Sequence, residues 1–584
     1  FATIQLIAIA VFSVFWLFNG YPILDIKHIV LYKTPLFEFF IDFYFDAATA
    51  VFAFVGGLIL LLVALFSKFY LHRDEGYKRF FCTMLLFYTG YNLVIFSGNF
   101  ETLFIGWEIL GFCSFLLIAF YRDRYLPVKN GLKVLSIYRL GDVCLIIAMW
   151  ICHHLFHQNI TFLQLSDANL LGTTESEHPY LFVLAALMIF LAAAAKSALL
   201  PFSSWLSRAM EGPTTSSAVF YGSLSIHLGA FLLIRTYPFW DGILAIKIII
   251  IATGIVTSLI ATAIARVQST VKTQIAYASI AQIGLITIEI AVGFHTLALI
   301  HFAGNALLRT YQLLVSPSVL SYKMHDMFFN FVPGSRKTNA SSRFRNAIYV
   351  LSIKEWNLDF MLFQYLWSPF KWFGRNMSFL VKRASVVAIS AVFLAGIFGF
   401  IGGDVLPAKF NQPLAILFSV IALLLILTAF AERGDARRAW ILVVAGQAFV
   451  ALSIAFNDNG SMQSLLLFLS GIAVSAIAGF VCLTQIKKFE NDISLNLFHG
   501  YTRDKPWLSF VFLLACLGLI GFPFTPTFIG IDLLFTHIHS DQPVLIVLTT
   551  LSFIFIELSI IRIYARIFLG PNKKMNHPIA YRSS

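Results

Sequence analysis

The sequence predicts an all-α polytopic membrane protein. Of its 584 residues, 59% are hydrophobic and only 12% are charged, against roughly 25% charged residues in soluble domains. Only helices and closed barrels satisfy their backbone hydrogen bonds inside lipid. The chain has continuous apolar stretches of about 20 residues, which suit helices, whereas the strands of a barrel would alternate over about ten.

Length and hydropathy predict about 16 transmembrane helices, some of them broken. The first ten are expected near residues 3–19, 47–66, 80–97, 102–120, 134–156, 180–200, 215–236, 243–265, 273–293 and 295–316. Six more are expected near residues 385–403, 412–430, 439–456, 463–485, 507–530 and 543–568.

The distribution of positive charge supports this order of helices. Loops after even-numbered spans are rich in Lys and Arg, as in Lys68, Arg73 and Lys78, and loops after odd-numbered spans are poor in them. This alternation follows the positive-inside rule and predicts that both ends lie on the side of the basic loops. The net charge of +12 is then mostly a loop bias, so we expect the lipid bilayer and no nucleic acid as a partner.

We expect four parts along the chain. Residues 1–46 form an N-terminal helix and loop, truncated upstream because the chain starts without Met inside an apolar run. Residues 47–320 form a first membrane module, and residues 385–584 form a second one. Between them, residues 321–384 begin as a basic loop and continue as an amphipathic segment with Trp and Lys at helical spacing, which predicts an interfacial helix. A helical linker outside the membrane is the alternative.

Charged side chains within apolar stretches point to ion movement. Glu108, Lys196, Lys272 and Arg309 lie in or beside such stretches. A lysine at a helix centre costs roughly 2.5–3.5 kcal/mol and is tolerated where it faces a partner, a water-filled cavity or an ion path. We expect Glu108 and Lys196 to pair, because attraction would keep the lysine charged and separation would let it release its proton. A purely structural ion pair is the alternative.

Polar residues near these charges are expected to support them. Arg139 and Asp142 should reach Glu108 from the next helix. Pro201, shortly after Lys196, breaks its helix and frees carbonyl groups, which is tolerated where the break lines a cavity. Tyr221 and His227 follow in the next span. His227 is a candidate proton relay, although a lone histidine in an apolar helix is more often structural.

A polar stripe follows on a later helix. His301, Asn305 and Arg309 are four residues apart and therefore share one helix face. Arg309 does not give up its proton, so it is expected to anchor water or neighbouring groups. In the second module, Asp532 follows two prolines that predict a broken helix, and it is either the end of a conduit or a structural residue.

No cofactor, metal or hydrolytic chemistry is indicated by the sequence. None of its six cysteines forms a CxxC pair, and nearly all lie in hydrophobic runs, which is typical of structural thiols. No GxGxxG or P-loop pattern is present. We therefore expect neither a cofactor nor a metal in this chain, and whether the chain belongs to an enzyme is left open.

Several motifs resemble the large antiporter-like subunit (chain 5 or chain L) of respiratory complex I and the large subunit of Mrp-type antiporters. They are GWE-x5-S-x-LLI-x-FY at 106–121, R-x-GD at 139–142, EGYKRFF at 75–81, AKSALLP at 195–201 and VKTQIAYASIAQIG at 271–284. The resemblance implies that residues 47–320 are a proton-conducting module and that Glu108, Lys196, Lys272 and the group at position 309 form a half-membrane proton path.

The resemblance implies a proton- or sodium-translocating subunit of a multisubunit energy-coupling complex, with a redox arm or antiporter subunits as partners. The chain departs from the family where Tyr221 and Asn305 stand in place of histidines and where Arg309 and Ile531 stand in place of lysines. Its amphipathic element lies mid-chain instead of in a long C-terminal lateral helix. The alternatives are a two-component inorganic-carbon uptake complex with a large soluble zinc-binding partner, and an Mrp-type antiporter. We expect an integral protein of a bacterial inner membrane rather than a mitochondrial one.

Overall fold

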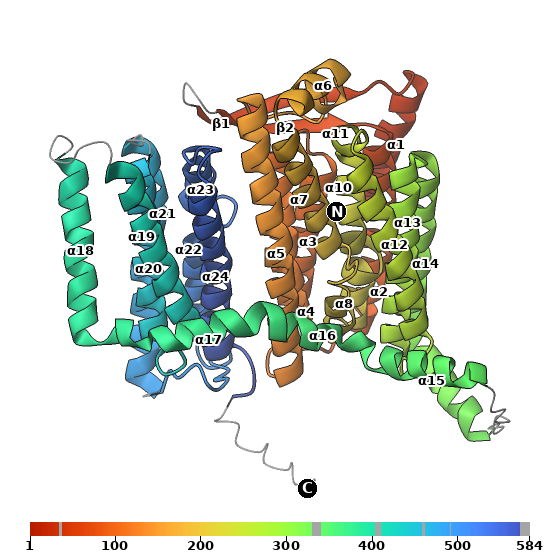
Figure 1. Ribbon diagram of the computed structural model, residues 1–584. Coiled ribbons are helices and arrows are strands. Elements are labelled where there is room, and N and C mark those ends of the chain that lie inside the picture. Colours follow the sequence, from red (N-terminus) through yellow and green to blue (C-terminus); the bar gives the residue numbers. More distant parts are fainter. Residues whose placement is uncertain (34–37, 330–339, 403–409, 458–461, 491, 573–584) are drawn as a thin grey trace, which may run out of the picture. The chain divides into compact units, whose positions relative to one another are not determined.

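The computed structural model describes residues 1–33, 38–329, 340–402, 410–457, 462–490 and 492–572, without the side chains of 27–28, 220–221 and 317–342. These residues are mostly helical (Figure 1). The predicted class, an all-α polytopic membrane protein, is confirmed. Within the described residues, 12 helices are long and apolar enough to cross a membrane, and three shorter apolar helices accompany them. The predicted count of about 16 spans stays a prediction.

The chain folds into two compact units. The first comprises Phe1–Phe120 and Lys133–Met361, and the second comprises Tyr121–Leu132 and Leu362–Ser584. The helices of the first unit are α1 (Ala2–Phe18), α2 (Ala47–Tyr70), α3 (Tyr77–Ile95), α4 (Phe100–Ile118), α6 (Ala168–Glu177), α7 (Pro179–Lys196), α8 (Ser204–Ala209), α9 (Thr214–Ser216), α10 (Leu228–Arg235), α11 (Tyr237–Trp240), α12 (Leu244–Ala265), α13 (Val271–Val292), α14 (His295–Phe329), α15 (Ala340–Ile353) and α16 (Leu358–Met361). Helix α5 (Tyr125–Phe156) begins in the second unit and belongs to the first from Lys133 onward.

A β-hairpin follows the first helix, where the sequence analysis expected only a loop. Strands β1 (Leu24–Lys33) and β2 (Glu38–Phe45) pair antiparallel. Aromatic and β-branched residues favour strands, and β2 is rich in both, with Phe39 and Phe40 buried. The expectation of a loop was wrong because neither strand keeps, over its whole length, the regular alternation of apolar and polar residues that identifies a strand.

Helix breaks occur beside the predicted charges. Helix α7 ends at Lys196 itself, and α8 begins only at Ser204. The following span, Thr214–Arg235, starts as α9, widens into a π-helical stretch at Ser217–Leu224, tightens at Ser225–His227 and ends as α10. Such irregular backbone at membrane depth frees polar groups that can line a wet interior.

Close packing of α12 against α13 depends on two glycines. A Cβ at Gly254 would lie 2.6 Å from the Gly284 carbonyl oxygen, and one at Gly284 would lie 2.7 Å from the Gly254 oxygen. Small residues at such crossings let transmembrane helices approach closely. This contact fixes α13, which carries the candidate residue Lys272.

The predicted interfacial helix over 353–377 is a series of short helices instead. Glu355, Trp356 and Asn357 have φ values of 49°, 54° and 52°, so the right-handed helix stops there. Then come α16, a π-helical turn at Leu362–Trp367, α17 (Ser368–Asn376) and a 3₁₀ turn at Met377–Val381. In the first unit, α16 lies at the end of the helices opposite to the hairpin (Figure 1).

The second unit contains the remaining helices. They are α17, α18 (Arg383–Ile401), α19 (Asn411–Ala431), α20 (Ala436–Asn457), α21 (Met462–Glu490), α22 (Pro506–Ile520), α23 (Pro526–Thr536) and α24 (Pro543–Phe568). The broken helix expected near Asp532 is present. It consists of α22 and α23, separated by a turn in which Gly521 has a φ of 83°.

Candidate functional site

A buried ion pair joins α4 to α5. Arg139 donates a hydrogen bond from Nη1 to Oε1 of Glu108 at 2.9 Å, and the two residues are 3% and 9% exposed. On the same two helices, the indole nitrogen of Trp107 donates to Oδ1 of Asp142 at 2.8 Å. The structure therefore brings Glu108, Arg139 and Asp142 together, as the spacing of the sequence suggested.

Lys196 is buried at the end of α7, with 1% of its surface exposed. Its ammonium donates to the main-chain oxygen of Trp107 at 3.2 Å. It also lies 4.6 Å from the Trp107 ring centre and 4.5 Å from the Tyr138 ring centre, a geometry that stabilises a cation electrostatically. Asp142 and Glu108 both attract it from further away. Trp107 thus links the lysine to the two carboxylates.

The arrangement differs in one respect from the expected Glu108–Lys196 pair. Glu108 makes its direct ion pair with Arg139. Within the described residues, Lys196 makes no ion pair at 4.0 Å or less and is held by a carbonyl group and two rings. Glu108 directly follows Trp107 in α4, and Trp107 contacts Lys196, so Trp107 connects Glu108 to Lys196.

Buried hydroxyl groups lie along the route from Lys196 toward His227. The hydroxyl of Tyr138 faces those of Ser225 and Ser114. Within the described residues, the buried hydroxyls of Tyr138 and Ser225 make no hydrogen bond that meets both the distance and the angle of a well-formed bond, although they lie close to each other. Buried polar atoms without a protein partner are usually satisfied by water, so this stretch suits a hydrated path.

A second polar chain runs through His227, which is fully buried. Arg309 Nε donates to Asn305 Oδ1 at 3.1 Å, so the amide nitrogen of Asn305 must face His227 Nε2, 3.0 Å away. His227 Nε2 therefore accepts, and Nδ1 carries the proton that is donated to the Ser223 carbonyl. The contacts of both ring nitrogens thus identify a neutral histidine.

The other predicted residues of the first unit occupy neighbouring positions. His301 lies 2.8 Å from both Glu289 and Gln282, two residues of α13. Lys272 donates to the carbonyl of Gly212 at 3.4 Å. Arg309 also contacts Gln312 at 2.7 Å and the carbonyl of Ala278 at 3.4 Å. These contacts do not join Lys272 or His301 directly to His227.

Two predicted residues lie apart from this group. The side chain of Tyr221 is outside the described residues. Asp532 belongs to α23 of the second unit, where its Oδ2 atom is buried without a hydrogen-bond partner among the described residues. The assignment of Asp532 to the proton path stays a prediction.

An ion pair that the sequence analysis missed joins α10 to the start of α2. Arg235 donates to Asp46 at 2.9 Å and 3.4 Å and to the Thr49 hydroxyl at 2.7 Å, and its guanidinium lies 4.4 Å from the Tyr44 ring centre. Asp46 also caps α2 through the Thr49 amide. An arginine ending an apolar run was the available signal, but its partner is 189 residues away.

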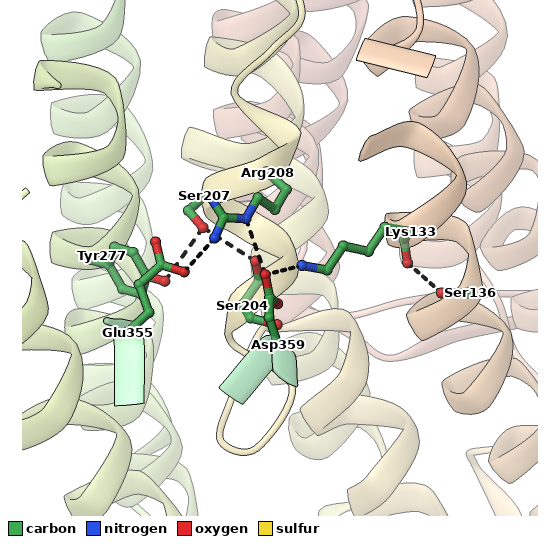
Figure 2. A network of polar contacts seen from close by, with 8 residues as sticks. All are labelled: Lys133, Ser136, Ser204, Ser207, Arg208, Tyr277, Glu355 and Asp359. Atoms are coloured by element: carbon green, nitrogen blue, oxygen red, sulfur yellow. Dashed lines mark hydrogen bonds and ion pairs between the residues drawn. The ribbon is translucent and has the colours of Figure 1, made fainter. Parts of the chain in front are cut away.

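A network of four charges, also missed, gathers around the left-handed turn (Figure 2). Asp359 pairs with Lys133 of α5 and lies 3.2 Å from Arg208 Nε of α8, while Arg208 Nη2 lies 3.0 Å from Glu355. Burial raises the pKa of Glu355 above its ordinary value, although Arg208 opposes this. Burial acts in the same sense on Asp359, but Lys133, Ser204 and Arg208 together outweigh it and hold the pKa of Asp359 below its ordinary value.

Metal ligands are not clustered in the described residues. No group of three or more His, Cys, Asp or Glu there could hold a metal ion. The six cysteines are free thiols, four of them buried. The expectations about metal and cofactor stay predictions.

The fold and the buried charges define a class, a polytopic helical membrane protein with ionisable groups linked through its interior. Residues 97–352 match the family described as "NADH:quinone oxidoreductase/Mrp antiporter, TM". Residues 33–81 match "NADH-Ubiquinone oxidoreductase (complex I), chain 5 N-terminus". The resemblance to the antiporter-like subunits of the complex I and Mrp superfamily, which the motifs predicted, is confirmed by these matches.

Named relatives agree with this family. The chain is 31% identical over 297 residues to NAD(P)H-quinone oxidoreductase subunit 5, chloroplastic, of Marchantia polymorpha, covering 50% of this chain and 42% of the relative. It is 33% identical over 282 residues to NADH-quinone oxidoreductase subunit L of Buchnera aphidicola, covering 47% and 45%. The matches therefore span less than half of these relatives.

A solved structure gives a weaker likeness. The Mrp complex from Dietzia sp. DQ12-45-1b matches 94% of this chain and 51% of the solved chain, with 18% identity and a TM-score of 0.48. That degree of similarity adds nothing to the functional assignment.

Proposed function

We propose that this chain is a proton-translocating membrane subunit related to chain 5 or chain L of NADH-quinone oxidoreductase. The observation that carries the proposal is the position of Lys196, which is buried but held by a carbonyl group and aromatic rings instead of a direct ion pair. A lysine held in this way can exchange its proton when nearby charges change. The family match supports the same function.

The Glu108–Arg139 pair can control that exchange. While Arg139 contacts Glu108, it offsets the negative charge of the carboxylate. If Arg139 moves away, the charge of Glu108 acts on Lys196 in full and favours the protonated lysine. When Arg139 returns, that attraction weakens and Lys196 gives up its proton more readily. Movement of Arg139 toward or away from Glu108 thereby makes Lys196 release or bind a proton.

The released proton has hydroxyl groups along its way. Tyr138, whose ring contacts the ammonium, faces Ser225, and Ser225 precedes His227 by two residues. His227 can take a proton at Nε2 once Asn305 releases that atom. Arg309 keeps its own proton. Because Arg309 orients Asn305, it controls when Nε2 of His227 becomes free to accept a proton.

Reconstituted vesicles test the proposal. A pH-sensitive dye would report proton uptake by the purified complex in sodium-free buffer, which also separates protons from sodium. Lys196→Ala should abolish uptake. Lys196→Arg keeps a positive charge but does not release a proton, so it should abolish uptake as well. Normal uptake by the alanine variant would refute the proposal, and normal uptake by the arginine variant alone would reduce Lys196 to a fixed charge.

The partners are proposed to be other subunits of a membrane complex, since the named relatives are subunits of oxidoreductases. Gentle purification of the native complex distinguishes the candidates. Flavin and iron–sulfur proteins would indicate a redox arm, and further antiporter subunits would indicate an Mrp-type assembly. A single large zinc-binding protein would indicate inorganic-carbon uptake.

A further inference from the structure

The segment 355–359, which carries Glu355 and Asp359, holds an unusual backbone conformation. Its first three residues are left-handed, with φ between 49° and 54°, and none is glycine. The left-handed conformation is unfavourable for residues other than glycine, because the Cβ atom lies too close to the following carbonyl oxygen. Strain of this kind persists where surrounding contacts fix it and is often found at functional sites. Here the contacts are the four charges described above.

The four charges are balanced but unequally buried. Arg208 contacts both carboxylates, and Lys133 contacts Asp359 (Figure 2). The Arg208 and Asp359 side chains are 40% and 31% exposed, whereas that of Glu355 is 11% exposed. Arg208 and Asp359 therefore reach the surface, and Glu355 lies beneath them.

The surroundings shift the pKa values of the two carboxylates in opposite directions. The cation next to Asp359 lowers the pKa of Asp359, while burial raises the pKa of Glu355. The charged and titratable groups that face Glu355 are Arg208, Asp359, Tyr277 and Lys133. Paired carboxylates whose surroundings separate their titration are a recurring sign of an acid–base site.

Glu355 also interacts with a hydroxyl group on α13, the helix that contacts the polar chain through Arg309, Asn305 and His227. Tyr277 of α13 interacts with Glu355 and donates to the Ser207 hydroxyl at 3.4 Å. The next residue, Ala278, accepts from Arg309, and the one after it, Ser279, accepts from Asn305 at 3.5 Å. One turn of α13 therefore contacts both Glu355 and the chain that ends at His227.

We propose that Glu355 is the carboxylate at which the first unit exchanges protons with water on the side of the basic loops, and that Asp359 is a positioning residue that holds Glu355 through Arg208. A proton from water binds Glu355, which passes it to the Tyr277 oxygen while that hydroxyl gives its own proton to the Ser207 oxygen, and Ser207 releases its former hydroxyl proton to an interior water molecule. Tyr277 is thus left unchanged. This inference rests on the proposed proton translocation and adds its point of exchange.

The test measures proton uptake by the reconstituted complex while the pH on the basic side varies from about 5 to 8. Glu355→Gln keeps the shape of the side chain but cannot exchange a proton. Uptake should fall by about a hundredfold or more, which is the lower end of the effect of a lost acid–base group, and its dependence on this pH should disappear. Glu355→Asp should restore part of that dependence.

Asp435 of the second unit provides a matched control. It is also a partly buried carboxylate paired with a lysine, Lys487, at 2.9 Å. Asp435→Asn should leave the rate and its pH dependence unchanged. If Glu355→Gln also leaves both unchanged, or lowers only the thermal stability, the inference is wrong. The same pH loss in the Asp435 variant would overturn it too, because the effect would not be specific.

Two further variants separate a failure of assembly or of transport from a failure of the proposed exchange site. If Glu355→Gln fails to assemble, Tyr277→Phe keeps all four charges and removes only the hydroxyl, so an unaltered rate and pH profile in that variant would overturn the inference. Wild-type uptake and its loss in Lys196→Ala are measured in parallel. Without wild-type uptake the proposed function itself fails, whereas normal behaviour of these two beside an unaffected Glu355→Gln refutes only the exchange site.

Discussion

Replacing Arg139 with methionine should destabilise the protein strongly. The side chain of Arg139 is 4% exposed and that of Glu108 is 11% exposed, with 2.9 Å between their polar atoms. Methionine fills similar volume without a charge, so the variant leaves a carboxylate buried without its cation. Breaking a buried ion pair in this way costs about 3–5 kcal/mol. The folding equilibrium should shift by between roughly a hundredfold and several thousandfold.

The double variant separates the charge from the packing. Glu108→Gln together with Arg139→Met removes both charges, and replacing a whole buried pair is often nearly neutral. We therefore expect the double variant to be more stable than the single Arg139→Met variant. The exposed pair of Lys33 and Glu38, 3.5 Å apart with the lysine 69% exposed, is the control. Lys33→Met should cost less than about 1 kcal/mol.

Reversible unfolding in mixed detergent micelles, followed by circular dichroism, would measure these free energies. The slope of free energy against denaturant must stay constant for the comparison to hold. A cost below about 1 kcal/mol for Arg139→Met would mean that Glu108 is already neutral or solvated. A double variant as unstable as the sum of the single variants would mean that packing, and not charge, accounts for the loss.

Two other predictions concern packing and pH. Gly229→Ala should destabilise the contact of α10 with α7 by about 1–3 kcal/mol, because the new Cβ would lie 2.2 Å from the Ala193 oxygen. Gly172→Ala is the control, since a Cβ at Gly172 would have no atom within 4 Å. Equal melting temperatures for the two variants would contradict this prediction. Despite its burial, the pKa of Asp435 is held below the ordinary value by Lys487. The stabilisation by the ionised Asp435 side chain should therefore be complete above about pH 4–5 and be lost as the pH falls through the lowered pKa. The difference in melting temperature between the wild type and Asp435→Asn should consequently disappear only in acid.

The sequence was informative where a charge interrupted an apolar run. Glu108, Arg139, Asp142 and Lys196 were identified in this way, and the structure places them around Trp107. The cost of an unpaired charge in lipid makes such positions conspicuous without any structure. The role of Trp107 itself was hidden, because its main-chain oxygen makes the key contact and no pattern of side chains reports that.

Long-range partners could not be predicted. Arg208 meets Asp359 across 151 residues, and Arg235 meets Asp46 across 189. Spacing along a helix predicts neighbours three or four residues apart, but it says nothing about contacts between distant segments. The left-handed turn at Glu355 was equally hidden, since it contains no glycine to mark it. The network in Figure 2 therefore became visible only with the fold.

The contact between Lys196 and the Trp107 carbonyl has a consequence for substitution and for divergence among relatives. An ordinary mutation at position 107 replaces the ring beneath the ammonium and the indole bond to Asp142, but it leaves the peptide oxygen in place. Evolution can therefore retune the electrostatics around this lysine by exchanging one aromatic residue, without ever removing its backbone anchor. Only an altered path of α4, or chemical replacement of the peptide bond itself, would remove that anchor.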